Sequence, residues 1–114
     1  MNKMKSSPFV FTEHYYPKEE HFDDVMNILL ETSVMIQKVD GALMCLSLKP
    51  AQKNGAITGF NMWESRDKFL AFMKSEHAKE IMDTGLAEKV KSWTTKITGE
   101  QYTVEQAWHV ESHE

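Results

Sequence analysis

Two segments that read as strands, residues 42–48 and 56–63, constrain the fold more than any other feature of this sequence. In the first, ALMCLSL, apolar side chains occupy both alternating sets of positions, so both faces of the strand are apolar. The second, AITGFNMW, also extends apolar surface to both sides. An Asn-Gly pair at residues 54–55 favours a hairpin connection, which makes the two strands antiparallel neighbours in a sheet.

The residues before this hairpin read as a strand followed by a helix. Aromatic and β-branched residues alternate over residues 8–16, which favours a strand. Pro17 and the acidic residues after it are typical of a helix start, and apolar residues at helical spacing continue to about Lys38. Gly41 follows at the position where a helix needs a left-handed cap residue.

The residues after the hairpin read as a second, interrupted helix and a last strand. Ser65 is suited to cap the helix N-terminus. Apolar residues recur at helical spacing as far as Ile97, with a break near residues 83–85. Beyond Gly99 the pattern alternates again, which predicts a final strand over residues 100–110.

The resulting order, β-α-β-β-α-β, predicts an α+β fold of the ferredoxin-like type, with an antiparallel sheet and both helices on one face. Because the central strands are apolar on both sides, the face without helices needs another layer. The simplest such layer is the sheet of a second subunit, so we expect a homodimer. The 114 residues make one domain, with a core over residues 9–109 and frayed ends at 1–7 and 110–114.

Composition and charge argue against several classes of protein. The chain is 41% hydrophobic and 26% charged, and it lacks the roughly 20 apolar residues of a membrane span. The N-terminus, MNKMKSSPFVF, lacks the continuous apolar stretch of a signal peptide, so we expect a cytoplasmic protein. The net charge is −4 and the lysines are scattered among acidic residues, which argues against a nucleic-acid partner.

The sequence indicates neither a metal site nor a nucleotide cofactor. The five histidines form no compact ligand cluster, and there is no glycine-rich phosphate-binding loop. The single cysteine, Cys45, lies in an apolar run and is expected to pack there rather than to react. We therefore expect a protein that works without a metal and without a cofactor.

The stretch that follows the hairpin resembles a known family. Trp-Glu-Ser at 63–65, Phe69 in the next helix and Ser-Glu-His-Ala at 75–78 are similar to the antibiotic biosynthesis monooxygenase family, and the resemblance covers about residues 9–109. It implies a dimeric α+β barrel in which two ferredoxin-like subunits pack sheet to sheet, with a pocket between each sheet and its helices. Members oxidise polyketide quinols or anthrones with oxygen and no cofactor, degrade haem, act as quinol monooxygenases, or have no assigned activity.

Three departures from the haem-degrading branch of that family argue against haem degradation. Phe72 stands where that branch has a tryptophan, Met82 stands where it has a histidine iron ligand, and the first strand contains no asparagine. His77 occupies the family's more general Ser-x-His position, so it does not replace the missing ligand.

Three polar residues are candidates for catalysis. Histidine titrates near neutral pH, so His77 is suited to act as a general base toward a phenolic substrate; alternatively it hydrogen-bonds backbone groups where the helix restarts. His14 shares a strand face with Thr12, and its alternative is an exposed strand end. Asn61, on an otherwise apolar strand, is a candidate to hold a substrate oxygen or to cap a neighbouring loop.

Four apolar residues are candidates to line a substrate pocket: Trp63, Phe72, Met82 and Trp108. The alternative is that these side chains are ordinary core and fill the volume themselves.

Two hypotheses for function follow. In the first, the chain is a cofactor-independent monooxygenase that binds a small electron-rich aromatic such as a quinol or hydroxyanthrone, deprotonates it and exposes the anion to oxygen. In the second, it is a non-enzymatic dimeric barrel that binds a small apolar ligand or a protein partner. An oxygenase needs an open pocket with a polar group facing it, whereas the binding protein does not.

Overall fold

The computed structural model of the chain describes residues 7–83 and 86–108, without the side chains of residues 82 and 83. The elements, in chain order, are β1 (Phe9–Pro17), η1 (Glu19–His21), α1 (Phe22–Ile36), β2 (Ala42–Leu48), β3 (Ile57–Trp63), α2 (Arg66–Met73), α3 (Glu76–Asp83), α4 (Leu86–Trp93) and β4 (Thr94–Thr103). The strands form one antiparallel sheet in the order β2-β3-β1-β4. This is the ferredoxin-like α+β fold that the sequence predicts.

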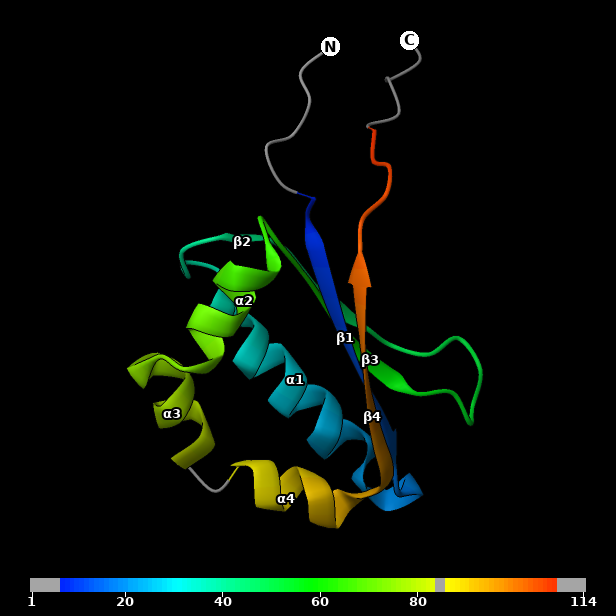
Figure 1. Cartoon of the computed structure of the whole chain (residues 1–114). Coiled ribbons are helices and arrows are strands. Elements are labelled where there is room, and N and C mark those ends of the chain that lie inside the picture. The colour runs from blue at the N-terminus through cyan, green and yellow to red at the C-terminus, as the bar shows by residue number, and fades with distance from the viewer. Residues whose placement is uncertain (1–6, 84–85, 109–114) are drawn as a thin grey trace, which may run out of the picture.

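All four α-helices lie on one side of the sheet (Figure 1), so its two faces differ in surroundings. We call the side toward the helices the inner face; there the hydroxyl Oγ of Ser47 on β2 lies 2.7 Å from Oγ of Ser33 on α1. The opposite side is the outer face. Because side chains alternate along a strand, Leu46 and Leu48, which flank Ser47, point to the outer face.

The core between the sheet and the helices has two parts. At one end, Trp63 and Phe9 pack against Phe69 of α2. Toward the other end of the sheet, Val25 and Leu29 of α1 pack on Ile57 of β3. Leu29 approaches the sheet at Gly59, where an added Cβ would lie 3.1 Å from its Cδ1 atom. The absence of a side chain at Gly59 therefore lets α1 pack closely against β3.

Two predicted local signals are confirmed. Gly41 has the predicted left-handed conformation, with φ +88°, although it lies in the turn before β2 and the cap residue of α1 is Gln37; an added Cβ would also collide with Lys68. Ser65 caps α2: its side chain accepts a hydrogen bond from the backbone N–H of Lys68 at 3.3 Å. Both signals are local, which is why the sequence alone was enough to place them.

Three predicted boundaries are wrong. Pro17 ends β1 rather than starting a helix, and α1 begins only at Phe22, after the short η1 turn. The second helical region ends at Trp93, so Ile97 belongs to β4, where it pairs with Tyr15 of β1, and β4 begins at Thr94 rather than at residue 100. The break predicted near residues 83–85 is present, since α3 ends at Asp83 and α4 begins at Leu86, and a further break separates α2 from α3. β-branched residues dominate from Thr94, and pairing with β1 outweighs their helical spacing.

Among the described helices, none combines the length and apolarity that a membrane crossing would require.

Candidate functional site

A cavity of about 680 Å³ lies between the inner face of the sheet and the helices. Four aromatic side chains form part of its wall: Phe11 and Tyr15 from β1, and Phe69 and Phe72 from α2. Residues of α1, α3 and α4, many of them aliphatic, line most of the remaining helical side. The volume falls within the range of ordinary small-molecule sites, which are mostly apolar with a few placed polar groups.

The aromatic wall continues into the core. The ring of Phe72 stacks on Trp63 with centroids 5.3 Å apart and planes at 27°, and Phe11 lies 5.0 Å from Phe69. Trp63 has no exposed surface and packs beneath the residues that line the cavity. The predicted lining residue Phe72 therefore faces the cavity, whereas Trp63 lies behind it.

Asn61 lines the cavity from β3, and its orientation is fixed by the core. The indole Nε1 of Trp63 donates a hydrogen bond to Oδ1 of Asn61 at 2.7 Å. An indole N–H can only donate, so the partner atom must be the amide oxygen rather than the nitrogen. No described residue forms a hydrogen bond with Nδ2 of Asn61. In the described part of the chain, every fully buried side-chain nitrogen or oxygen has a hydrogen-bond partner. Nδ2 is therefore not fully buried, and this donor is accessible.

Glu13 and Tyr15 bring a second polar group into the cavity from β1. The hydroxyl of Tyr15 donates a hydrogen bond to Oε1 of Glu13. Burial, together with the negative charge of Glu13 and this hydrogen bond, raises the pKa of Tyr15 well above its usual value. Tyr15 is thus held as a neutral donor beside the carboxylate.

The position of Glu13 in the sheet leaves it without a side chain directly opposite on either neighbouring strand. Its partners in register are Gly59 on β3 and Gly99 on β4. Among the described residues of the lining, the other charged side chains are Lys74 and Lys79, both solvent-exposed on the helical side. Among the described lining residues, Glu13 is the one with a carboxylate, and it lies on the side of the cavity that the sheet forms.

Neither predicted catalytic histidine is among the described residues that line the cavity. Nε2 of His77 lies 3.1 Å from the backbone carbonyl oxygen of Met35 near the end of α1, and a carbonyl can only accept, so Nε2 donates. His14 lies on the outer face, with Nδ1 2.8 Å from Oγ1 of Thr58 and Nε2 3.3 Å from Oγ1 of Thr12. The structure therefore separates both histidines from Asn61.

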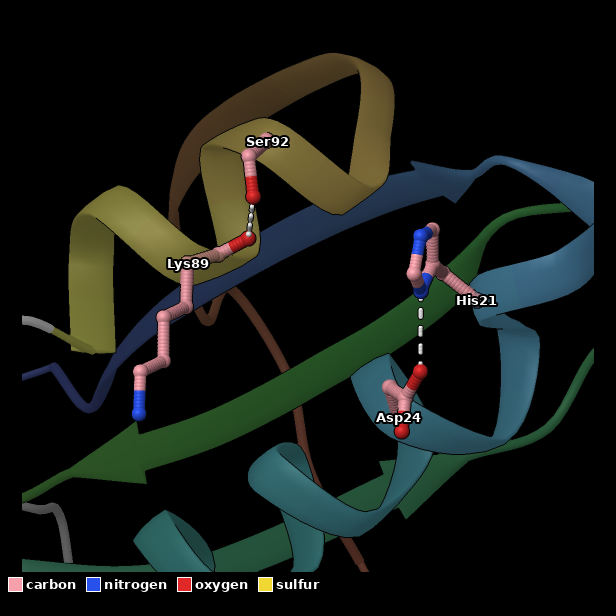
Figure 2. A network of polar contacts seen from close by, with 4 residues as sticks. All are labelled: His21, Asp24, Lys89 and Ser92. Atoms are coloured by element: carbon pink, nitrogen blue, oxygen red, sulfur yellow. Dashed lines mark hydrogen bonds and ion pairs between the residues drawn. The ribbon is translucent and has the colours of Figure 1, made fainter.

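A third histidine, His21, has a local structural contact (Figure 2). Its Nδ1 lies 2.9 Å from Oδ2 of Asp24 in the first turn of α1, and its ring stacks on Trp93 at 5.5 Å. In the same view, the hydroxyl of Ser92 donates to the carbonyl of Lys89 within α4. The two contacts of His21 join the start of α1 to the end of α4, and none of these residues is among the described residues that line the cavity.

The two remaining predicted lining residues do not add to the described site. The side chain of Met82 lies outside the described residues. Trp108 follows the end of β4 and is 72% exposed, so it is neither core nor cavity wall in this chain.

The sequence interpretation missed Glu13 and Tyr15. A signal was present: Glu13 shares its strand parity with Phe9, Phe11 and Tyr15, so it is an acidic residue on the aromatic face of the first strand. The interpretation chose the polar pair of the other parity, Thr12 and His14, which lies on the face away from the cavity.

Comparison with known proteins agrees with this architecture. The sequence model of the antibiotic biosynthesis monooxygenase family matches residues 8–84. The chain belongs to this family. The resemblance noted in its sequence is thereby confirmed, and the match includes β1, β3 and α2, which supply Glu13, Asn61 and the four aromatic side chains of the cavity.

Solved structures related to this family member share its fold at low sequence identity. A mutant of SnoaB from Streptomyces nogalater, described as a cofactor-independent oxygenase, has a TM-score of 0.70 and 12% identity, covering 90% of this chain and 97% of that chain. A dimeric ferredoxin-like protein from an uncultured marine organism has a TM-score of 0.72 and 15% identity, covering 96% and 97%. A protein from Shewanella oneidensis has a TM-score of 0.74 and 10% identity, covering 90% and 95%. No curated protein is significantly similar in sequence.

Proposed function

We propose that this member of the antibiotic biosynthesis monooxygenase family is a cofactor-independent monooxygenase that oxidises a small electron-rich aromatic, such as a quinol or hydroxyanthrone. The observation that carries the proposal is the oriented Asn61 amide in a cavity with aromatic walls. Family membership and the shared fold with SnoaB, a described cofactor-independent oxygenase, support it.

The cavity suits a flat aromatic ligand. Phe11, Phe69 and Phe72 offer ring faces and edges for stacking, which favours an aromatic over an aliphatic ligand of similar size. The part of a ligand that is buried here is shielded from water, which strengthens the hydrogen bonds made at the sheet.

Asn61 supplies the electrostatic part of the chemistry. When an aromatic alcohol or enol loses its proton, negative charge develops on oxygen, and the anion is the form that passes an electron to dioxygen. The Nδ2 donor of Asn61, held by Trp63, is preorganised to stabilise that charge. For an anthrone, the overall change is one methylene and one dioxygen giving one carbonyl and one water.

We also propose that the chain works as a homodimer joined through the outer face of the sheet. On β2, Met44, Leu46 and Leu48 are 44%, 42% and 42% exposed on this face. Leu46 pairs in register with Phe60 of β3, which continues the apolar surface. The helices cover only the other face, and a ferredoxin-like neighbour is described as dimeric.

A binding protein without catalytic activity is the second candidate. One observation favours it: the polar groups on the cavity floor already bond to each other, Glu13 with Tyr15 and Asn61 with Trp63. Such a cavity would hold a small apolar ligand without changing it.

Oxygen uptake by purified protein, with chelator present, tests the proposal against this candidate. The substrates are dithranol, a hydroxyanthrone, and menadiol, a quinol. We expect uptake above the rate without protein, with a loss of about a hundredfold to a thousandfold in Asn61→Ala, the range for removal of one oxyanion donor. Asn27→Ala, which changes an exposed asparagine of α1, is the matched control and should retain full activity.

Binding of both compounds without any uptake would favour the binding protein. Equal oxygen uptake by the wild type and Asn61→Ala would contradict the proposal that the Asn61 amide stabilises the substrate anion.

A further inference from the structure

We propose that Glu13 is the catalytic residue that accepts the substrate's proton, and that Tyr15 positions it. The inference rests on the proposed function, because it assigns a proton acceptor to the same cavity. It differs from the assignment that the sequence suggests, in which a histidine has this role.

The first argument is the free acceptor capacity of the carboxylate. The Tyr15 hydroxyl occupies Oε1 of Glu13, and no bond from another described residue reaches Oε2. Every fully buried side-chain oxygen of the described residues has a hydrogen-bond partner. Oε2 is therefore not fully buried, and it is accessible. A carboxylate has room for several donors, so Oε2 is available to a substrate hydroxyl.

The second argument is the location of Glu13 relative to Asn61. Both face the cavity, from the neighbouring central strands β1 and β3. The partner of Asn61 in register is Phe11, two residues before Glu13 on the same face, so the two polar groups are diagonal neighbours. Diagonal neighbours of an antiparallel pair lie about 7–8 Å apart, which leaves room for one substrate oxygen between them.

The third argument is that the hydrogen bond from Tyr15 restricts the side-chain conformation of Glu13. A glutamate side chain has several rotatable bonds, and a catalytic base must be held near its working geometry. Tyr15 shares the inner face with Glu13 and bonds it through one oxygen only. Since its pKa lies above the usual value, Tyr15 stays a hydrogen-bond donor and does not compete for the substrate's proton.

The proton and electrons balance through the following sequence. The O–H bond of the phenol or enol breaks, its proton moves to Oε2 of Glu13, and its electron pair stays on the substrate as an anion stabilised by Asn61. The anion adds dioxygen by electron transfer and recombination, giving a peroxide anion. Glu13 returns its proton to that peroxide, and the resulting hydroperoxide loses water to form the carbonyl. The carboxylate is thereby regenerated.

The chain supplies a matched control for the test. On β4, the hydroxyl of Tyr102 donates to Oε2 of Glu100 with the same two-residue spacing, but both side chains are exposed and neither lines the cavity among the residues described. Glu13→Gln and Glu100→Gln each remove a carboxylate and keep an oxygen that can accept from the tyrosine. Only the first should affect the chemistry.

The experiment separates proton transfer from oxidation. Under anaerobic conditions, dithranol bound to the wild type should show the absorption band of its anion, whereas dithranol bound to Glu13→Gln should keep the band of the neutral form. Oxygen is then admitted and uptake is measured. We expect kcat to fall by about a hundredfold or more in Glu13→Gln, with Glu100→Gln unchanged and Glu13→Asp partly active.

The outcomes for Glu13 and for the proposed function are distinct. An anion in the wild type that is lost in Glu13→Gln, but without oxygen uptake, supports Glu13 and overturns the oxygenase. Equal uptake in wild type and Glu13→Gln overturns Glu13 and leaves the oxygenase standing. If Glu13→Gln is misfolded by circular dichroism, Tyr15→Phe replaces it: a loss of anion at unchanged dithranol affinity supports positioning of the carboxylate, and an unchanged anion band contradicts it.

Discussion

Nε1 of Trp63 donates a 2.7 Å hydrogen bond to Oδ1 of Asn61, so a core side chain without exposed surface orients an amide that faces the cavity. The relationship couples folding stability to the site, because any change at Trp63 alters both the packing of the core and the direction of the amide.

Trp63→Phe should therefore affect stability and turnover together. We expect a loss of about 2–4 kcal/mol in the free energy of unfolding, from the smaller ring and the missing donor. In turnover, Trp63→Phe and Asn61→Ala should be non-additive, because both remove the same oriented amide. Denaturant unfolding and a double-mutant cycle on kcat would measure this. Trp93→Phe, at the other end of the core, is the control, and fully additive losses would contradict the coupling.

Gly41→Ala should destabilise the fold without touching the cavity. The residue has φ +88°, and an added Cβ would lie 2.5 Å from Cβ of Lys68. We expect a loss of about 1–3 kcal/mol in the free energy of unfolding. Gly99→Ala is the control, since its nearest contact would be 3.4 Å and its φ is not positive. Equal effects of the two variants in thermal unfolding would show that the left-handed conformation is not the cause.

His77→Ala should weaken folding rather than catalysis. The variant loses the hydrogen bond from Nε2 to the carbonyl of Met35, which is worth about 0.5–1.5 kcal/mol. His77→Gln, which keeps a donor, should recover part of that loss. Unfolding midpoints and kcat measured on both variants would distinguish a structural role of His77 from a catalytic one. A large fall in kcat at unchanged stability would restore His77 as the base that the sequence suggested.

Tyr15 should make the fold sensitive to alkaline pH. Its pKa is raised in the folded state, so its contribution to stability is complete below the usual tyrosine pKa of about 10. Above that pH the unfolded state ionises first, and stability is lost as pH rises. The stability difference between wild type and Tyr15→Phe should be flat below about pH 10 and should shift against the wild type above it. A difference that stays flat across the whole pH range would contradict the prediction.

Leu46→Glu should dissociate the proposed homodimer. The change places a charge on the outer face, opposite Phe60 in the sheet register, where a partner's sheet would bury it. Sedimentation should show a dimer for the wild type and a monomer for the variant. Val34→Glu changes a side chain of α1 that is 62% exposed, and should leave the dimer intact. A monomeric wild type at micromolar concentration would contradict the dimer.

The sequence by itself determined the order of elements, the ferredoxin-like fold and the family. Periodicity distinguishes strand from helix because side chains repeat at two residues in one and near 3.6 in the other. Gly41 and Ser65 were readable because their reasons are local: a left-handed backbone and a helix cap. The β-branched run at residues 94–98 was misread because its apolar spacing also fits a helix, and only pairing with β1 decides between them.

Only the tertiary structure decided which polar residues line the cavity. Alternation sorts β1 into two faces but does not say which face meets the helices, so Glu13 and His14 were equally eligible from the sequence. Packing of α1 and α2 on the sheet places Glu13 in the cavity and leaves His14 on the outer face. The same packing brings His77 to the carbonyl of Met35, a residue far away in the sequence. Such contacts depend on how whole elements dock, and this information is not present in any single stretch of the chain.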